Sequence, residues 1–136
     1  MTILLVEDNL AHQKITEYVL KRNNVKANIF VVRDGQEALD YLYHKNSYTD
    51  ILSFPLPDLI LLDLNLPKRD GREVLKVIKD DPILKDIPIV IVSTSDREED
   101  VNYAFEHGVV AYISKSKGFD KYTVELADVA KYARVS

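Results

Sequence analysis

The chain has 136 residues, of which 46% are hydrophobic and 29% charged, with a formal net charge of −4. This length allows one domain with a full core, and the acidic balance argues against a nucleic-acid-binding or membrane-surface protein. There is no cysteine, which excludes disulfides, thiolate metal sites and cysteine nucleophiles. No apolar stretch approaches the length of a membrane span, so a cytoplasmic protein is expected.

Strand-like and helix-like segments alternate from end to end. Strands are predicted at 2–6, 27–32, 58–63, 89–93 and 111–114, and helices near 9–22, 36–44, 71–79, 97–107 and 120–134. An aspartate followed three residues later by a glutamate predicts the helix starts at Asp34, Asp70 and Asp96. The long connection 45–56 is expected to be a solvent loop, with a partner contact as the alternative.

These repeats predict an α/β fold, a doubly wound parallel five-stranded sheet with helices on both faces. The continuous apolar runs Ile3–Val6, Leu59–Leu62 and Ile89–Val92 are typical of strands buried on both faces. The last helix has an apolar stripe for docking on the sheet, made of Tyr122, Leu126, Val129 and Ala133. The whole chain, 1–136, is interpreted as a single domain.

Reactive side chains follow several of the predicted strands directly. Glu7 and Asp8 end the first strand, Asp63 ends the third, Ser93 and Thr94 close the fourth, and Lys115 follows the fifth. In open parallel sheets, ligands bind beyond the carboxyl ends of the strands, where these side chains would meet. The pattern predicts a magnesium site around a nucleophilic aspartate, Asp63.

Each residue type suits one task in phosphoryl transfer. Asp63 would accept a phosphoryl group, while Glu7 and Asp8 offer the hard oxygen ligands that Mg²⁺ prefers. The Lys115 ammonium would offset the negative charge, and the Ser93 hydroxyl could donate to a phosphate oxygen. Taken singly, each residue could be an ordinary strand-end side chain. The three histidines are scattered without ligand spacing and are interpreted as surface or helix-end residues, not metal ligands.

With these residues in this order, the chain resembles the receiver domains of two-component response regulators over essentially its whole length. The matching segments are Leu5–Asn9, Asp58–Pro67 with Asp70 and Gly71, Ile87–Ser95, and Tyr112–Lys115. More narrowly, it is similar to the single-domain receivers that partner phytochrome-type histidine kinases. The cues are Val32–Gly35, Leu64–Lys68 with Asp70–Leu75, Ser93–Ser95, and Lys115 with Ser116.

The resemblance implies a flavodoxin-like (βα)5 fold with strand order 2-1-3-4-5. It also implies phosphotransfer from a kinase phosphohistidine to Asp63, with Mg²⁺ held by Asp8, Asp63 and the Asn65 carbonyl, and by Glu7 through water. Lys115 would pair with Asp63 or its phosphate.

The resemblance also assigns a switch and a control of phosphate lifetime. Ser93 and Tyr112 would relay the phosphorylated state, and Asn65 and Ser95 would influence how long the phosphate survives. The sequence departs from the usual pattern at two positions. Ser116 stands where most receivers have proline, which leaves the geometry of the Lys115–Ser116 bond open, and Ser93 replaces the commoner threonine.

The expected function is that of a stand-alone response regulator, a phosphoprotein that catalyses only its own phosphorylation and dephosphorylation. Its expected partners are a histidine kinase, possibly phytochrome-type, and a downstream target or phosphotransfer protein that reads its C-terminal face, with a homodimer possible. No nucleic acid or membrane is expected as a partner. The alternatives are a phosphorylation-independent binding module and a haloacid-dehalogenase-like phosphohydrolase, which would need an acid at Asn65.

Overall fold

The computed structural model describes residues 1–134, so the last two residues of the predicted domain lie outside the described part. The strands are β1 (Thr2–Val6), β2 (Asn28–Val32), β3 (Leu59–Leu62), β4 (Ile89–Ser93) and β5 (Ala111–Ser114). The α-helices are α1 (Leu10–Arg22), α2 (Gly35–Leu42), α3 (Gly71–Asp80), α4 (Glu98–Glu106) and α5 (Phe119–Ala127). Two short 3-10 helices, η1 (Asn46–Tyr48) and η2 (Val129–Tyr132), complete the described elements.

The strands form one parallel sheet in the order β2-β1-β3-β4-β5, which confirms the predicted fold. The register aligns Val6 at the end of β1 with Val32 of β2 and with Leu62 of β3. Ser93 at the end of β4 aligns in the same way with Ser114 of β5. The carboxyl ends of the strands therefore lie along one edge of the sheet, and the residues that follow them are close neighbours.

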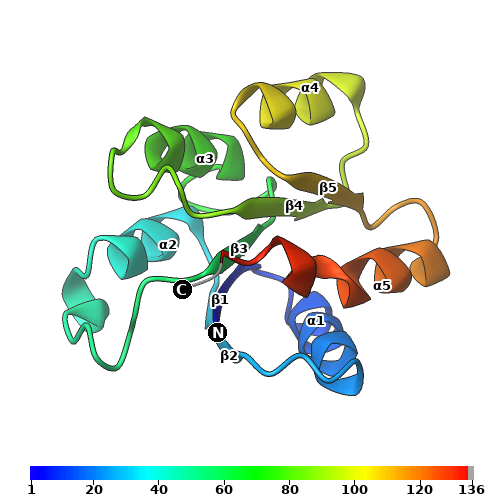
Figure 1. Cartoon of the computed structure of the whole chain (residues 1–136). Helices are drawn as coiled ribbons and strands as arrows, with labels where there is room; N and C mark the ends of the chain where they lie inside the picture. The colour runs from blue at the N-terminus through cyan, green and yellow to red at the C-terminus, as the bar shows by residue number, and fades with distance from the viewer. Residues whose placement is uncertain (135–136) are drawn as a thin grey trace.

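Helices cover both faces of the sheet (Figure 1). On one face, α1 and α5 pack over a core that includes Ile3 and Leu5 of β1. On the other face, α2, α3 and α4 pack over a core that includes Leu4 and Val6. Successive residues of β1 thus enter opposite cores, as the two-residue period of a strand requires, and every residue of β1, β3 and β4 is buried.

The predicted helix starts are right at two of three positions. Asp34 accepts from the Glu37 N–H at 2.8 Å and Asp70 from the Arg72 N–H at 3.3 Å. The start at Asp96 is wrong, because α4 begins at Glu98 and Asp96 instead accepts from the Ser116 hydroxyl at 3.3 Å. A contact between two loops overrides the local pattern there.

The last predicted helix is not continuous to residue 134. Helix α5 ends at Ala127 and the tighter η2 follows, after which the Arg134 N–H donates to the Asp58 carbonyl at 3.0 Å. The tighter turn brings the chain back to the start of β3. The docking stripe is confirmed, since Tyr122, Leu126 and Val129 are buried in the core and Ala133 packs against it.

The connection 45–56 is only partly a solvent loop. Its Tyr48 and Phe54 rings stack edge-on at 4.9 Å and pack against Tyr41 and Phe30. The Tyr48 hydroxyl also donates to Glu37 at 2.7 Å. The tip of the loop is exposed, with Leu52 90% accessible. This segment is therefore held against α2 by Tyr48 and Phe54, while residues 45–47 and 49–53 are exposed.

Gly71 fixes the distance between α3 and the end of β3. A Cβ at this position would lie 2.2 Å from the Asp63 carbonyl oxygen and 2.6 Å from Leu64 Cα, both backbone atoms. The Gly71 N–H meanwhile donates to the Leu64 carbonyl at 2.9 Å. Only glycine allows the helix to approach this closely, so Gly71 determines where Asp63 sits relative to α3.

We expect Gly71→Ala to lower the free energy of unfolding by about 1–3 kcal/mol, because backbone must move to admit the methyl group. Amide resonances of Asp63 and Leu64 should shift. The matched control is Gly108→Ala. A Cβ there meets only Lys79 Cε at 3.9 Å, so this variant has no backbone clash, although its φ of 78° is strained for alanine. Unchanged Asp63 and Leu64 resonances in Gly71→Ala would contradict this account of the glycine.

Candidate functional site

Three carboxylates meet at the carboxyl edge of the sheet. Glu7 and Asp8 follow β1 and Asp63 follows β3, and one oxygen from each lies within 4.8 Å of the others. The Asp63 N–H donates to the Val6 carbonyl at 3.1 Å, which holds the two strand ends together. Glu7 and Asp63 are buried, at 3% and 6% exposure, while Asp8 faces solvent. The three acids predicted to act together are therefore in contact range.

Lys115 reaches into the acid cluster from the end of β5. Its side chain is 3% exposed, and its ammonium pairs with Glu7 Oε1 and, at 3.2 Å, with Asp63 Oδ2. The Lys115 N–H donates to the Ser93 carbonyl at 2.8 Å, so the backbone is anchored to β4. The prediction that Lys115 lies beside Asp63 agrees with this geometry.

Burial and charge have opposite effects on the pKa values of Glu7 and Lys115. Burial raises the pKa of the Glu7 carboxyl to about 7, although the hydrogen bond and charge of Lys115 act in the opposite direction. Burial would lower the pKa of Lys115, but Asp63 and Glu7 outweigh it and raise that pKa above its usual value. Lys115 is therefore a cation at neutral pH, held by the carboxylates around it.

His12 is a member of the site that the sequence did not indicate. Its Nδ1 lies 3.1 Å from Lys115 Nζ and 3.8 Å from Glu7 Oε1. Burial and the neighbouring Lys115 charge lower the pKa of His12, so the ring is neutral and can accept a hydrogen bond from the ammonium. The sequence signal that could have indicated it is the helix N-cap Asn9. Asn9 accepts from the His12 N–H at 3.0 Å, which places His12 in the first turn of α1, next to the acid cluster.

Ser93 and Tyr112 are joined through the backbone of Ser95. Ser93 is fully buried, and its Oγ accepts from the Ser95 N–H at 3.1 Å. The Tyr112 hydroxyl donates to the Ser95 carbonyl at 2.7 Å. The two residues predicted to act as a switch therefore share one neighbour on the loop between β4 and α4.

Asn65 and Ser95 border the same hollow, which has a volume of about 330 Å³ and is also lined by Thr94 and Arg72. The Asn65 N–H donates to Asp63 Oδ1 at 3.0 Å, and its amide lies 3.5 Å from the Thr94 hydroxyl. Asn65 thus both lines this hollow and is hydrogen-bonded to the Asp63 carboxylate. The Lys115–Ser116 peptide is trans, as are the other peptide bonds of residues 1–134.

The donor set fits a divalent cation. Three carboxylates offer hard oxygen atoms within 4.8 Å of one another, and one of these acids, Asp8, is open to solvent. Within the part of the chain that the structure describes, Lys115 is the one lysine paired with this cluster, so negative charge remains in excess. Mg²⁺ and Mn²⁺ both suit such oxygen ligands.

Residues 3–126 match the family model of the response regulator receiver domain. The chain belongs to this family. Response regulator Rcp1 of Synechocystis sp. is 45% identical over 115 residues, which cover 85% of this chain and 76% of Rcp1. This receiver therefore acts in two-component signalling, and the phosphohydrolase alternative is not favoured.

Solved receiver structures have the same fold. The Mn²⁺-bound form of Rcp1 superposes with a TM-score of 0.88 at 39% identity, covering 99% of this chain and 96% of that one. The phosphorylated cyanobacterial phytochrome response regulator RcpA gives 0.87 at 42% identity, covering 97% and 92%. Within residues 1–134, none of the helices combines the length and apolarity that crossing a membrane requires.

Proposed function

We propose that Asp63 is the phosphoacceptor of this receiver. A carboxylate oxygen of Asp63 would form the new P–O bond while the P–N bond of a kinase phosphohistidine breaks and its electron pair returns to the imidazole. The observation that carries the proposal is the fixing of Asp63 through both oxygens. Oδ1 accepts from the Asn65 N–H at 3.0 Å and Oδ2 from Lys115 at 3.2 Å. A carboxylate held in this way is oriented before the donor arrives.

The remaining residues of the site would act on the charge of the phosphoryl group. Lys115 already contacts Asp63, so its ammonium can follow the negative charge onto the phosphoryl oxygens. Asp8, Asp63 and the Asn65 carbonyl would hold Mg²⁺, with Glu7 acting through water. When bound, the ion supplies positive charge that offsets the phosphoryl oxygens. The Mn²⁺-bound form of Rcp1 supports a divalent ion at such a site.

The receiver would catalyse only its own phosphorylation and dephosphorylation. Asn65 and Ser95 border one hollow, and Asn65 is hydrogen-bonded to Asp63, so side chains there would control the access of the water that attacks the acyl phosphate. We assign them to phosphate lifetime on this basis. Residues 1–136 form one receiver domain in this proposal, and a cytoplasmic location remains a prediction from the sequence.

The output face would be formed by α4, β5 and α5. Ser93 and Tyr112 meet at Ser95, and the Tyr112 ring lines a hollow of about 190 Å³ together with Phe105, Lys117 and Lys121. A displacement of Ser93 toward the phosphate would alter the Ser95 backbone and therefore Tyr112. A downstream protein or a phosphotransfer protein would read that change, and a second copy of the chain is the alternative reader.

The kinase partner is proposed to be phytochrome-type. The support is the similarity to RcpA, which is described as a phytochrome response regulator and shares 42% identity with this chain. The Lys115–Ser116 pair and the Asp70–Leu75 segment, the narrower cues in the sequence, point the same way.

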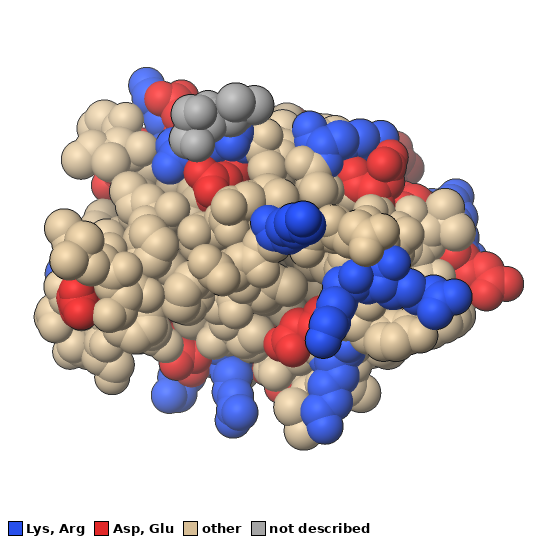
Figure 2. Space-filling model, turned by 60° about the horizontal axis from the view of Figure 1, so that its bottom comes forward, with Lys and Arg blue, Asp and Glu red and all other residues tan. Residues whose placement is uncertain are grey.

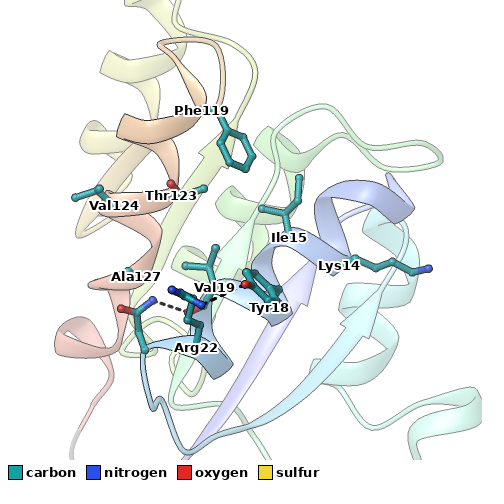
Figure 3. Close-up of a pocket in the computed structure, with 10 residues that line it drawn as sticks. Lys14, Ile15, Tyr18, Val19, Arg22, Phe119, Thr123, Val124 and Ala127 are labelled. Atoms are coloured by element: carbon teal, nitrogen blue, oxygen red, sulfur yellow. Dashed lines mark hydrogen bonds between the residues drawn. The ribbon is translucent and has the colours of Figure 1, made fainter.

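The kinase would dock on the groove between α1 and α5. The groove has a volume of about 500 Å³, and its apolar lining comes from both helices: Ile15, Val19, Phe119, Val124 and Ala127 (Figure 3). Helix α1 begins directly after the acid cluster, and α5 begins soon after Lys115. A helical domain seated here could bring its phosphohistidine to Asp63.

Charge favours the same occupant. Lys14 and Arg22 border the groove, and in Figure 2 lysine and arginine side chains alternate with aspartate and glutamate side chains over this side of the molecule. An amphipathic partner helix with acidic side chains beside its apolar stripe fits this surface.

We expect Asp63→Asn to abolish phosphoryl uptake from acetyl phosphate, because the amide is not a nucleophile. Intact-mass spectrometry should find one phosphoryl group on the wild-type protein with Mg²⁺ and none without it. Asp86→Asn, which alters an exposed carboxylate outside the site, is the matched control and should behave as wild type. Undiminished uptake by Asp63→Asn would refute the assignment.

Val124→Glu should separate kinase docking from chemistry. The side chain is 70% exposed, so the fold should tolerate the change, but a carboxylate in the groove would repel an acidic partner helix. We expect phosphotransfer from a phosphorylated phytochrome-type kinase to slow about tenfold, corresponding to ~1.4 kcal/mol. Uptake from acetyl phosphate should not change. The control is Leu52→Glu, on the loop tip, and equal kinase rates for both variants would exclude the groove.

A further inference from the structure

The buried Lys115 ammonium has a hydrogen-bond acceptor for each of its three N–H groups. Two of these acceptors are carboxylate oxygens, Glu7 Oε1 and Asp63 Oδ2, and the third is His12 Nδ1 at 3.1 Å. The lysine side chain is 3% exposed, so water has little access to it. An ammonium has three donors and no acceptor, so these partners use its full hydrogen-bonding capacity. Within residues 1–134, His12 therefore completes the shell around Lys115.

This contact determines the state of the His12 ring. Lys115 can only donate, so Nδ1 must present its lone pair to the ammonium, and the hydrogen of the neutral ring then lies on Nε2. Burial and the Lys115 charge keep the pKa of His12 below its usual value, in agreement with a neutral ring. His12 differs in this respect from the carboxylates. It holds the ammonium without adding negative charge, so the positive charge of Lys115 stays available to a phosphoryl group.

The first turn of α1 fixes His12 relative to Glu7. The His12 N–H donates to the Asn9 side chain at 3.0 Å, and the Asn9 N–H donates to Glu7 Oε2 at 3.2 Å. Gln13, which is 6% exposed, donates through Nε2 to the Glu7 carbonyl at 2.7 Å. The helix turn and the end of β1 are thus bonded to each other. Two of the three acceptors of the ammonium belong to this one rigid unit.

Two held N–H groups determine the direction of the third. The hydrogens of an ammonium point to the corners of a tetrahedron, so contacts with both Glu7 and His12 prevent its rotation. The remaining N–H then points to Asp63 Oδ2, 3.2 Å from the nitrogen. Phosphorylation would place new negative charge on this side of the lysine. A donor that is oriented toward developing charge in advance needs no reorganisation during the reaction.

We propose that His12 is a positioning residue for phosphoryl transfer, which aims Lys115 at Asp63 by accepting a hydrogen bond from the ammonium. The inference deepens the proposed function and rests on it, because the direction of the ammonium matters only if Asp63 takes up the phosphoryl group. His12 acts through Lys115. What the site requires from residue 12 is an acceptor atom at the place of Nδ1, and the rest of the imidazole ring is dispensable.

The test compares phosphoryl uptake from acetyl phosphate and Mg²⁺ by His12→Leu and His12→Asn. An Asp63 oxygen forms the new P–O bond while the P–O bond to acetate breaks, and acetate leaves with the electron pair. Leucine has no acceptor, whereas asparagine Oδ1 is attached to Cγ as Nδ1 is. Time courses of intact mass should show uptake about tenfold slower in His12→Leu and within about twofold of wild type in His12→Asn. A small donor also keeps kinase docking out of the measurement.

The matched control is Lys21→Leu, which places the same apolar side chain at an exposed position in the last turn of α1. It should take up phosphoryl groups at the wild-type rate. His12→Leu should fold, because the His12 side chain is 29% exposed.

A second measurement does not depend on activity. A buried ammonium held by three acceptors exchanges its hydrogens slowly and gives a resolved NMR signal. The Lys115 ammonium signal should persist in His12→Asn and broaden beyond detection in His12→Leu. In the wild-type protein, the ring nitrogen shifts of His12 should place the hydrogen on Nε2. A loss of overall stability alone would not separate the two His12 variants in this way.

The outcomes are distinguishable. An uptake rate in His12→Leu equal to that of wild type would overturn the proposal. Uptake by His12→Asn as slow as by His12→Leu would overturn it too, because the acceptor atom would then not be what matters. Equal slowing in Lys21→Leu, or a hydrogen on Nδ1 of His12, would also contradict it. Failure of the wild-type protein to take up a phosphoryl group would instead contradict the assignment of Asp63, on which the role of His12 depends.

Discussion

The pairing of one buried ammonium with two buried carboxylates is the interaction on which the rest of the site depends. Lys115 lies between Glu7 and Asp63, which follow different strands and are each less than a tenth exposed. Without the ammonium, these acids would repel one another in a poorly solvated place, and removing one partner from such a group is strongly destabilising. The parallel sheet makes the arrangement possible, because the carboxyl ends of β1, β3 and β5 all lie on the same side of it.

This charge balance also prepares the site for reaction. Lys115 satisfies Asp63 through one oxygen and the Asn65 N–H satisfies the other, while Asp8 remains open to solvent. The carboxylates would then receive the positive charge of a divalent ion, and the Lys115 ammonium the negative charge of a phosphoryl group. The route from there to the α4–β5–α5 face is short, since Ser93 and Tyr112 meet at a single residue, Ser95.

The fold was predictable because local and global signals agree. The apolar runs of β1, β3 and β4 are buried on both sides, and Asp34 and Asp70 cap helices as their spacing indicates. Predictions failed where a distant contact prevails. Asp96 resembles a cap but is bound to Ser116, and the last helix tightens at Asp128 so that Arg134 can reach Asp58.

Much of the site was predictable for the same reason, since strand order alone brings Glu7, Asp8, Asp63 and Lys115 together. His12 was missed because a lone histidine on a helix carries no ligand spacing, and its contact with Lys115 spans 103 residues. The Arg72–Asp100 ion pair could not be predicted from the sequence either. Its partners are 28 residues apart on different helices, and each taken singly is indistinguishable from a solvated surface charge.

Chemical location of the phosphoryl group tests the central claim most directly. Borohydride reduces an acyl phosphate to an alcohol, so a phosphorylated aspartate becomes homoserine, which peptide mass spectrometry can place in the sequence. After incubation with acetyl phosphate and Mg²⁺, the account predicts homoserine at position 63 and at no other aspartate. Homoserine at position 8, or phosphoprotein in which Asp63 survives reduction unchanged, would contradict it.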